Sequence, residues 1–273
     1  MSAALAIQFV VILLVAGSAA GVLAGLLGVG GGIVLVPAFL VVLELWGYSG
    51  TGAMQMAVAT SLATIIVTSS RSVRAHWTRG AVDMALLKRL APAVAVGALA
   101  GMGLAQIVES VHLQAIFGAI GSCVGLYMML APSVARPGAT LPRPPITTAC
   151  AGVFGMLSAL IGIGGGSFFV PFLTYFGRGP HQAVATSAGM GVVIAVPAVI
   201  GFLLVPTAAD APPLTVGQVN LAAAGVVVCA TVLCAPLGAR LAHWLNPALL
   251  KRVFGGFLIL TAGRMLIGAI GAL

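Results

Sequence analysis

The chain has 273 residues, of which 61% are hydrophobic and only 6% are charged. A soluble domain carries about 25% charged residues, so this composition excludes a soluble globular protein. The formal net charge of +8 does not indicate nucleic-acid binding, because the cations cluster between apolar segments, where they set membrane topology and attract anionic lipid headgroups. We therefore expect membrane lipids, and no nucleic acid, as partners.

Ten apolar segments follow one another along the chain, and lipid requires each to be helical so that its backbone groups are paired internally. In the first half they lie at 6–27, 33–45, 53–70, 90–108 and 113–131. In the second half they lie at 146–161, 167–176, 183–205, 218–237 and 253–272. A full span takes about 20 residues, so the second segment of each half is too short to cross alone. The first segment is interpreted as a span and not as a cleaved signal peptide, because no Lys or Arg precedes it.

Short motifs of the first half return in the second half. Residues 27–37 read Leu-Gly-Val-Gly-Gly-Gly-Ile-Val-Leu-Val-Pro, and residues 161–171 read Ile-Gly-Ile-Gly-Gly-Gly-Ser-Phe-Phe-Val-Pro. The run Ala-Val-Ala-Thr-Ser occurs at 57–61 and at 183–187, and a Gly-x-Val motif occurs at 80–82 and at 217–219. We predict an all-α integral membrane protein of two repeats of about five helical segments each, 1–131 and 146–273, joined by a Pro-rich linker at 132–145.

The distribution of Lys and Arg between the segments predicts the orientation. Five cations lie at 71–89, and further cations lie in the linker and at 238–252, whereas 106–112 and 206–217 contain none. The basic segments are expected in the cytoplasm, so the linker is cytoplasmic and both termini are periplasmic. Because each half has an odd number of segments, the two repeats are predicted to be inverted. The first two segments of each repeat form a glycine-tipped hairpin that either crosses the membrane or re-enters.

Glycine-rich breaks at the hairpin tips are the candidate binding elements. Glycine allows close backbone approach, and the free N–H groups at the start of the following short helix can hold an anion without a charged side chain. Paired Gly/Pro-interrupted segments also mark the binding sites of transporters, whereas tight packing through small residues is the alternative. The glycines expected to bind are Gly30, Gly31, Gly32, Gly164, Gly165 and Gly166. Neither break matches the dinucleotide-binding motif Gly-x-Gly-x-x-Gly, because Ile33 and Ser167 stand where that motif has its last glycine. We expect no cofactor.

Hydroxyl groups near these breaks are expected to donate to a bound oxyanion. They belong to Thr60, Ser61, Thr64, Ser167, Thr186 and Ser187. The alternative for each hydroxyl is a hydrogen bond back to its own helix or a capping role. Five residues are expected either to gate the site or to contact the residues that bind the ligand: Pro37, Gln55, Pro171, His181 and Gln182.

Acidic side chains are scarce, and the four that occur lie near segment ends: Glu44, Asp83, Glu109 and Asp210. A carboxylate in mid-membrane would mark a cation or proton site, so their positions favour an anion as the ligand. We expect no metal site. Arg71, Arg74 and Arg178 can draw anions to the cytoplasmic mouth.

The duplicated motifs resemble those of the sulfite exporter TauE/SafE family. The resemblance extends over nearly the whole chain, and it rests on 28–32 with Pro37, on Thr60-Ser61, on 162–166 with Pro171, and on Thr186-Ser187. It implies a small transporter of the bacterial inner membrane that moves a sulfur-containing anion of the sulfite, organosulfonate or thiosulfate type. Export by alternating access is the expected mode. The second copy departs from the first at Ser167, which stands where the first copy has Ile33.

Three other functions remain as alternatives. A passive anion channel can be built on the same scaffold. An intramembrane serine hydrolase at Ser167 would need a His or Lys at similar depth to activate the hydroxyl, and the sequence offers none there, so we do not expect an enzyme. An assembly factor would need more surface outside the membrane than the short outer loops provide.

Overall fold

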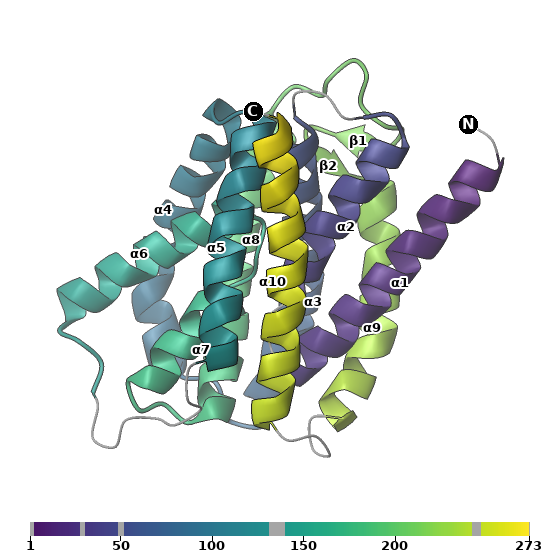
Figure 1. The fold of residues 1–273 in the computed structure, drawn as a ribbon. Coiled ribbons are helices and arrows are strands. Elements are labelled where there is room, and N and C mark those ends of the chain that lie inside the picture. Colours follow the sequence, from purple (N-terminus) through teal and green to yellow (C-terminus); the bar gives the residue numbers. More distant parts are fainter. Residues whose placement is uncertain (1–2, 28–30, 49–51, 131–139, 242–246, 273) are drawn as a thin grey trace.

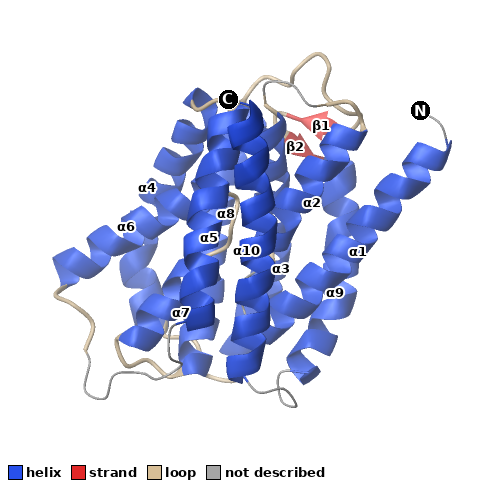
Figure 2. Ribbon diagram, viewed as in Figure 1, coloured by secondary structure: helices blue, strands red, loops and turns tan. Residues whose placement is uncertain are grey.

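The computed structural model describes residues 3–27, 31–48, 52–130, 140–241 and 247–272. These residues form ten α-helices and one two-stranded antiparallel sheet (Figure 1; Figure 2). The helices are α1 (Ala3–Leu27), α2 (Gly32–Leu45), α3 (Ala53–Trp77), α4 (Met84–Ile107), α5 (Ser110–Leu130), α6 (Pro144–Leu160), α7 (Gly166–Tyr175), α8 (Pro180–Leu204), α9 (Leu221–Leu241) and α10 (Pro247–Ala272), and the strands are β1 (Thr215–Val216) and β2 (Val219–Asn220). The predicted all-α membrane fold is confirmed, and six of the described helices are long and apolar enough to cross a bilayer.

The helices run between two ends of the molecule that differ in chemistry (Figure 1). The connections 78–83 and 176–179 lie at what we call the basic end, which carries Arg71, Arg74, Arg79, Lys88, Arg89 and Arg178. The strands lie at the opposite, sheet end, together with the first turn of α1 and the last turn of α10. The hairpin of α1 and α2 opens to the sheet end, whereas α7 returns from α6 toward the basic end. With 14 and 10 residues, α2 and α7 are too short for a full span.

The basic segment predicted at 71–89 is mostly helical, which corrects its assignment as a loop. Helix α3 continues to Trp77 and α4 begins at Met84. Arg is a good helix former, and its long side chain can reach water from a helix end. At the other side of the connection, the Asp83 carboxylate accepts the backbone N–H of Leu86 at 3.0 Å and so caps α4.

The sheet is a second departure from the prediction, which treated 206–217 as a plain loop. In the antiparallel pair, Thr215 lies opposite Asn220 and Val216 lies opposite Val219. Gly217 has φ +60°, which suits the first central position of a two-residue hairpin turn.

Helices from the two halves of the sequence pack against each other pair by pair. The most extensive contacts join α1 with α9, α4 with α6, α5 with α10, and α3 with α8, and Figure 1 shows α5 and α10 side by side. Each pair combines one helix from before the predicted linker and one from after it. Most of that linker, 132–145, lies outside the described residues. The halves are therefore interlocked and not two separate globular units.

Helices α3 and α8 form the buried centre of the molecule. The apolar windows of these helices are 72% and 56% buried, compared with 33% or less for the other four long spans. The outer helices turn large apolar side chains outward, as a lipid-facing surface requires. Examples that are at least 68% exposed are Val96, Ile107, Leu130, Leu233, Leu260 and Ile267.

Close backbone contact through glycine holds the outer helix pairs together. A Cβ atom built at Gly101 of α4 would overlap the carbonyl oxygen of Met156 on α6, and one at Gly97 would overlap that of Gly152. Small residues spaced four apart allow this approach in membranes, where helix association depends on packing. On the same helix, a Cβ at Gly103 would meet nothing within 4 Å.

We expect Gly101→Ala to destabilise the protein by about 1–3 kcal/mol, because the added methyl group must push two backbones apart. Gly103→Ala should be neutral or stabilising, since alanine favours a helix. Thermal unfolding of the two purified variants in the same detergent checks the difference. Equal midpoints for the two variants would contradict the close α4–α6 contact.

Candidate functional site

The two glycine breaks come together in the middle of the protein. Gly31, the residue before α2, has φ +74°, and Gly162, in the break between α6 and α7, has φ +71°. A Cβ at Gly32 would lie 2.7 Å from the Gly162 carbonyl oxygen, and a Cβ at Gly162 would lie 2.9 Å from Cα of Val58 on α3. Only glycine fits such backbone contacts. Gly30 lies outside the described residues.

The second break leads into α7, whose start lies against α8. Gly164, Gly165 and Gly166 are all buried. A Cβ at Gly165 would lie 2.9 Å from the carbonyl oxygen of Ser187 on α8. The first N–H groups of α7 have no carbonyl of their own helix to bind. Because the start of α7 is buried, the positive end of its dipole lies inside the protein.

Each of the two short helices contains a proline. Pro37 lies in α2 and Pro171 lies in α7. Because proline has no N–H group, it leaves the carbonyl four residues earlier without its helical partner. The freed carbonyls belong to Ile33 and Ser167, which occupy equivalent positions in the two motifs.

The threonines of the repeated Ala-Val-Ala-Thr-Ser motif make equivalent contacts. The hydroxyl of Thr60 on α3 accepts the backbone N–H of Asn220 at 3.1 Å, and that of Thr186 on α8 accepts the backbone N–H of Asp83 at 3.0 Å. The side chain of each partner then accepts an N–H from the first turn of the helix that follows it, α9 or α4. Each threonine thus connects a central helix to the start of a helix in the other half.

Asp83 and Asn220 were not expected at the site from the sequence. A signal for them was present, because the repeated Gly-x-Val motifs at 80–82 and 217–219 end one residue before each of them. What the sequence lacked was a reason to connect these positions with Thr60 and Thr186, more than 100 residues away.

We expect Thr186→Val to destabilise the protein by about 1–3 kcal/mol, because the Asp83 N–H would lose its acceptor. Thr186→Ser retains the oxygen and should stay near the wild-type value. Thermal unfolding in detergent separates the two, and the same comparison applies at Thr60. A Thr186→Val variant as stable as Thr186→Ser would show that the contact contributes nothing.

The serines of the two motifs differ in their contacts. Ser61 donates to the Gly162 carbonyl at 2.8 Å and so ties α3 to the second glycine break. Thr64 donates to the Ser61 carbonyl at 2.7 Å, which is the own-helix bond considered as its alternative. By contrast, the buried hydroxyl of Ser187 has no hydrogen-bond partner among the described residues.

Two more serine hydroxyls around the second break share this lack of a partner within the described chain. They are Ser167 in the first turn of α7, and Ser158 near the end of α6, which the sequence analysis did not single out. The backbone of Ser158 contacts the break directly, because its carbonyl accepts the N–H of Ile163 at 2.9 Å. A buried, unpaired polar group costs about 1–3 kcal/mol. The three hydroxyls belong to α6, α7 and α8, which contact one another.

The other predicted polar residues lie away from this cluster. Gln55 donates to the Val108 carbonyl at 2.8 Å and accepts from the Ser110 hydroxyl at 2.6 Å, so it fastens the start of α3 to the turn between α4 and α5 at the sheet end. His181 and Gln182 lie in the first turn of α8 at the basic end. Neither side chain makes a hydrogen bond to another residue within the described ranges.

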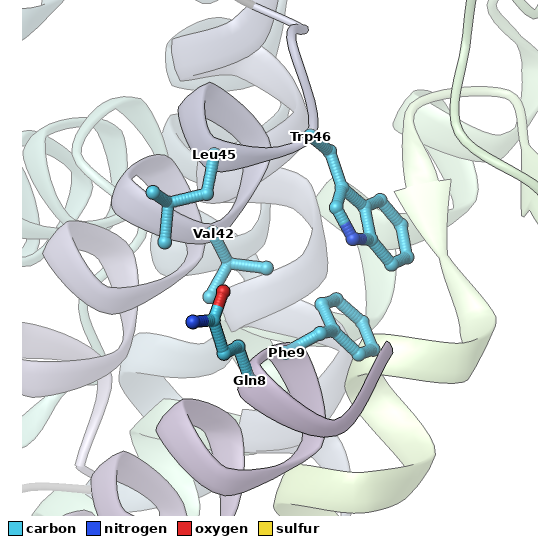
Figure 3. A pocket seen from close by; sticks show the side chains of 5 residues that line it. All are labelled: Gln8, Phe9, Val42, Leu45 and Trp46. Carbon is cyan, nitrogen blue, oxygen red and sulfur yellow. The ribbon is translucent and has the colours of Figure 1, made fainter. Parts of the chain in front are cut away.

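Two small hollows lie at the sheet end. The one in Figure 3 is lined by Gln8, Phe9, Val42, Leu45 and Trp46. The second shares Phe9 and Trp46 and reaches Thr60 and Asn220. Each holds a volume of about 10 Å³, which is room for about one water molecule. The rings of Phe9 and Trp46 stack with centroids 4.0 Å apart, so this conformation is closed to an anion beside Thr60.

Tyr48, between α2 and α3, is buried at the same end. Burial and, to a smaller extent, the nearby Asp210 carboxylate raise the pKa of its phenol above the ordinary value of 10.0, since a dry and a negative environment both disfavour a phenolate. The phenol therefore stays neutral at physiological pH.

Short glycine-broken helices that meet between two interlocked sets of spanning helices, with unpaired donors beside them, define a multi-pass membrane transporter. The chain matches the family model described as Sulfite exporter TauE/SafE over residues 13–265 and belongs to that family. Among the described residues, no three His, Cys, Asp or Glu side chains gather in a way that could hold a metal ion.

Relatives in distant organisms are similar over most of their length. A probable membrane transporter protein of Haemophilus influenzae is 30% identical over 261 residues, which cover 94% of this chain and 98% of the relative. One from Methanocaldococcus jannaschii is 22% identical over 90% of this chain and 91% of its own length. The probable membrane transporter protein YunE of Bacillus subtilis is 32% identical over 65% of this chain and 72% of its own. No solved structure matches the chain.

Proposed function

We propose that the chain is a secondary carrier for a small sulfur-containing oxyanion of the sulfite, organosulfonate or thiosulfate type. One observation carries the proposal. The hydroxyls of Ser158, Ser167 and Ser187 are buried around the second glycine break and have no partner in the described chain. An oxyanion offers several acceptor oxygens, so it can take hydrogen bonds from hydroxyls and from free N–H groups at the start of α7. Ser167, Ser187 and 164–166 are thus proposed as the main ligand groups.

The first glycine break is proposed as the weaker partner in this site. Its serine, Ser61, already donates to Gly162, and Ile33 offers no hydroxyl where the second copy has Ser167. Thr60 and Thr186 each accept a backbone N–H and still have a hydroxyl hydrogen to donate when the site opens. Gly31 and Gly32 bring the second break into place by close contact.

Several features support an anion as the cargo. The chain has only four acidic residues, and all of them lie at helix ends or in connections outside the buried centre. A cation site at this depth would need a carboxylate or a set of free carbonyls. The description of the family points the same way, since sulfite is an anion.

Alternating access by two inverted repeats, 1–131 and 146–273, is the proposed mechanism. It is supported by the opposite directions of the central pair α3 and α8 and of the pair α5 and α10 (Figure 1). We place the basic end in the cytoplasm of a bacterial inner membrane and both termini in the periplasm, following the excess of Lys and Arg. Export is then the favoured direction, because a monovalent anion leaving a negative interior gains about 2.3 kcal/mol per 100 mV.

Flux of ³⁵S-labelled sulfite in proteoliposomes containing the purified chain tests the proposal, with labelled thiosulfate and sulfoacetate as further substrates. We expect saturable flux and counterflow. Ser167→Ala and Ser187→Ala should each lower the flux at subsaturating sulfite about tenfold or more, since a hydrogen bond to a charged group contributes about 1.5–3 kcal/mol. The same variants should be as stable as the wild type or more stable, because each removes an unpaired buried hydroxyl.

Thr261→Val is the matched control. Thr261 lies on α10, and among the described residues its hydroxyl donates only to carbonyls of its own helix, those of Phe257 and Leu258. Its flux should be unchanged. Full activity in both serine variants would refute the ligand assignment, and linear flux without counterflow, accompanied by an ionic current, would favour the channel.

A further inference from the structure

The basic end contains one acidic residue. Of the four acids in the chain, Glu44 lies in the last turn of α2, Glu109 between α4 and α5, and Asp210 between α8 and β1. These parts of the elements lie at the sheet end, whereas Asp83 lies between α3 and α4 at the basic end (Figure 1). The Asp83 carboxylate is therefore surrounded by residues of opposite charge.

The carboxylate of Asp83 joins the two halves of the chain. Its Oδ2 lies 3.2 Å from Nη2 of Arg178, and the two side chains are 15% and 38% exposed. Asp83 belongs to the connection between α3 and α4, whereas Arg178 belongs to the connection between α7 and α8. Through its backbone N–H, the same residue also binds Thr186 of the central helix α8. The ion pair is therefore connected directly to the neighbour of Ser187.

The chain itself shows that capping and threonine binding do not need this charge. At the sheet end, the neutral Asn220 makes the same two contacts, to Thr60 and to the first turn of α9. Its remaining amide group donates to Pro213 at 3.1 Å and to Thr215 at 2.9 Å, which are local partners in the strand connection. Only at the basic end does the equivalent residue make an ion pair across the two halves.

We propose that Asp83 and Arg178 form a releasable latch over the cytoplasmic route to the site, which rests on the proposed function. When no anion is present, the Asp83 carboxylate occupies the guanidinium of Arg178. An entering sulfur oxyanion replaces that carboxylate, because a guanidinium binds the oxygens of either group with the same pair of N–H donors. The exchange separates the two connections and frees α8 to move. Arg178 is thus the first residue to bind the substrate, and the Asp83 carboxylate occupies the guanidinium until the substrate arrives.

Thiol labelling tests the latch without any substrate. The four native cysteines are replaced, Ser187→Cys is added as a reporter, and inverted membrane vesicles are treated with a membrane-impermeant maleimide from the cytoplasmic face. Asp83→Asn and Arg178→Gln should each raise the labelling rate about two- to fivefold, as expected for loss of a partly exposed ion pair. Arg79→Gln is the control, because it removes the same charge from the same end without an ion pair among the described residues.

The apparent KM for ³⁵S-sulfite entering from the cytoplasmic face gives the second measurement. Asp83→Asn should lower it, because Arg178 becomes free, whereas Arg178→Gln should raise it. Labelling rates equal to that of Arg79→Gln would overturn the latch, and a KM that moves in the same direction in both variants would overturn the exchange. If the wild type carries no sulfite, thiosulfate or sulfoacetate, the proposed function fails, while the labelling result still decides the latch.

Discussion

An unpaired polar group costs several kcal/mol in a bilayer, and this constraint governs the arrangement around the two glycine breaks. Each break interrupts a helix inside the protein, so its backbone groups need partners from other helices. Ser61 supplies one by donating to Gly162, and the missing side chain of Gly32 allows the two breaks to meet. Beside the second break, by contrast, three buried serine hydroxyls have no hydrogen-bond partner among the described residues.

The contacts of the repeated threonines tie the central helices to the starts of α9 and α4. Thr60 and Thr186 both anchor the residue that caps a helix of the other half. The same hydrogen bonds therefore join the centre to both ends of the molecule. The two threonine contacts have the same pattern but involve different capping residues, the neutral Asn220 at the sheet end and the charged Asp83 at the basic end.

The pairing of helices from different halves also bears on which parts can move. Because α1 packs closely on α9, and α6 on α4, the halves of the sequence do not separate as blocks without breaking glycine-lined contacts. We infer that the helix pairs move as units. Movement is then expected where packing is less extensive, between these pairs and the central helices.

The membrane class, the number of helical segments and the glycine-tipped hairpins could be predicted from the sequence, because apolar length and glycine spacing are local properties of the chain. Thr60, Ser61, Thr186 and Ser187 could be chosen as candidates from the repeat. Their roles could not be predicted, because it depends on tertiary neighbours whether a hydroxyl donates to a distant carbonyl, as in Ser61, or to its own helix, as in Thr64. Asp83, Asn220 and Ser158 joined the site only in three dimensions, where residues far apart in the sequence come within hydrogen-bonding distance. Local pattern thus determined which segments enter the membrane, and the packing of the helices around α3 and α8 decided which of the described polar groups found partners and which did not.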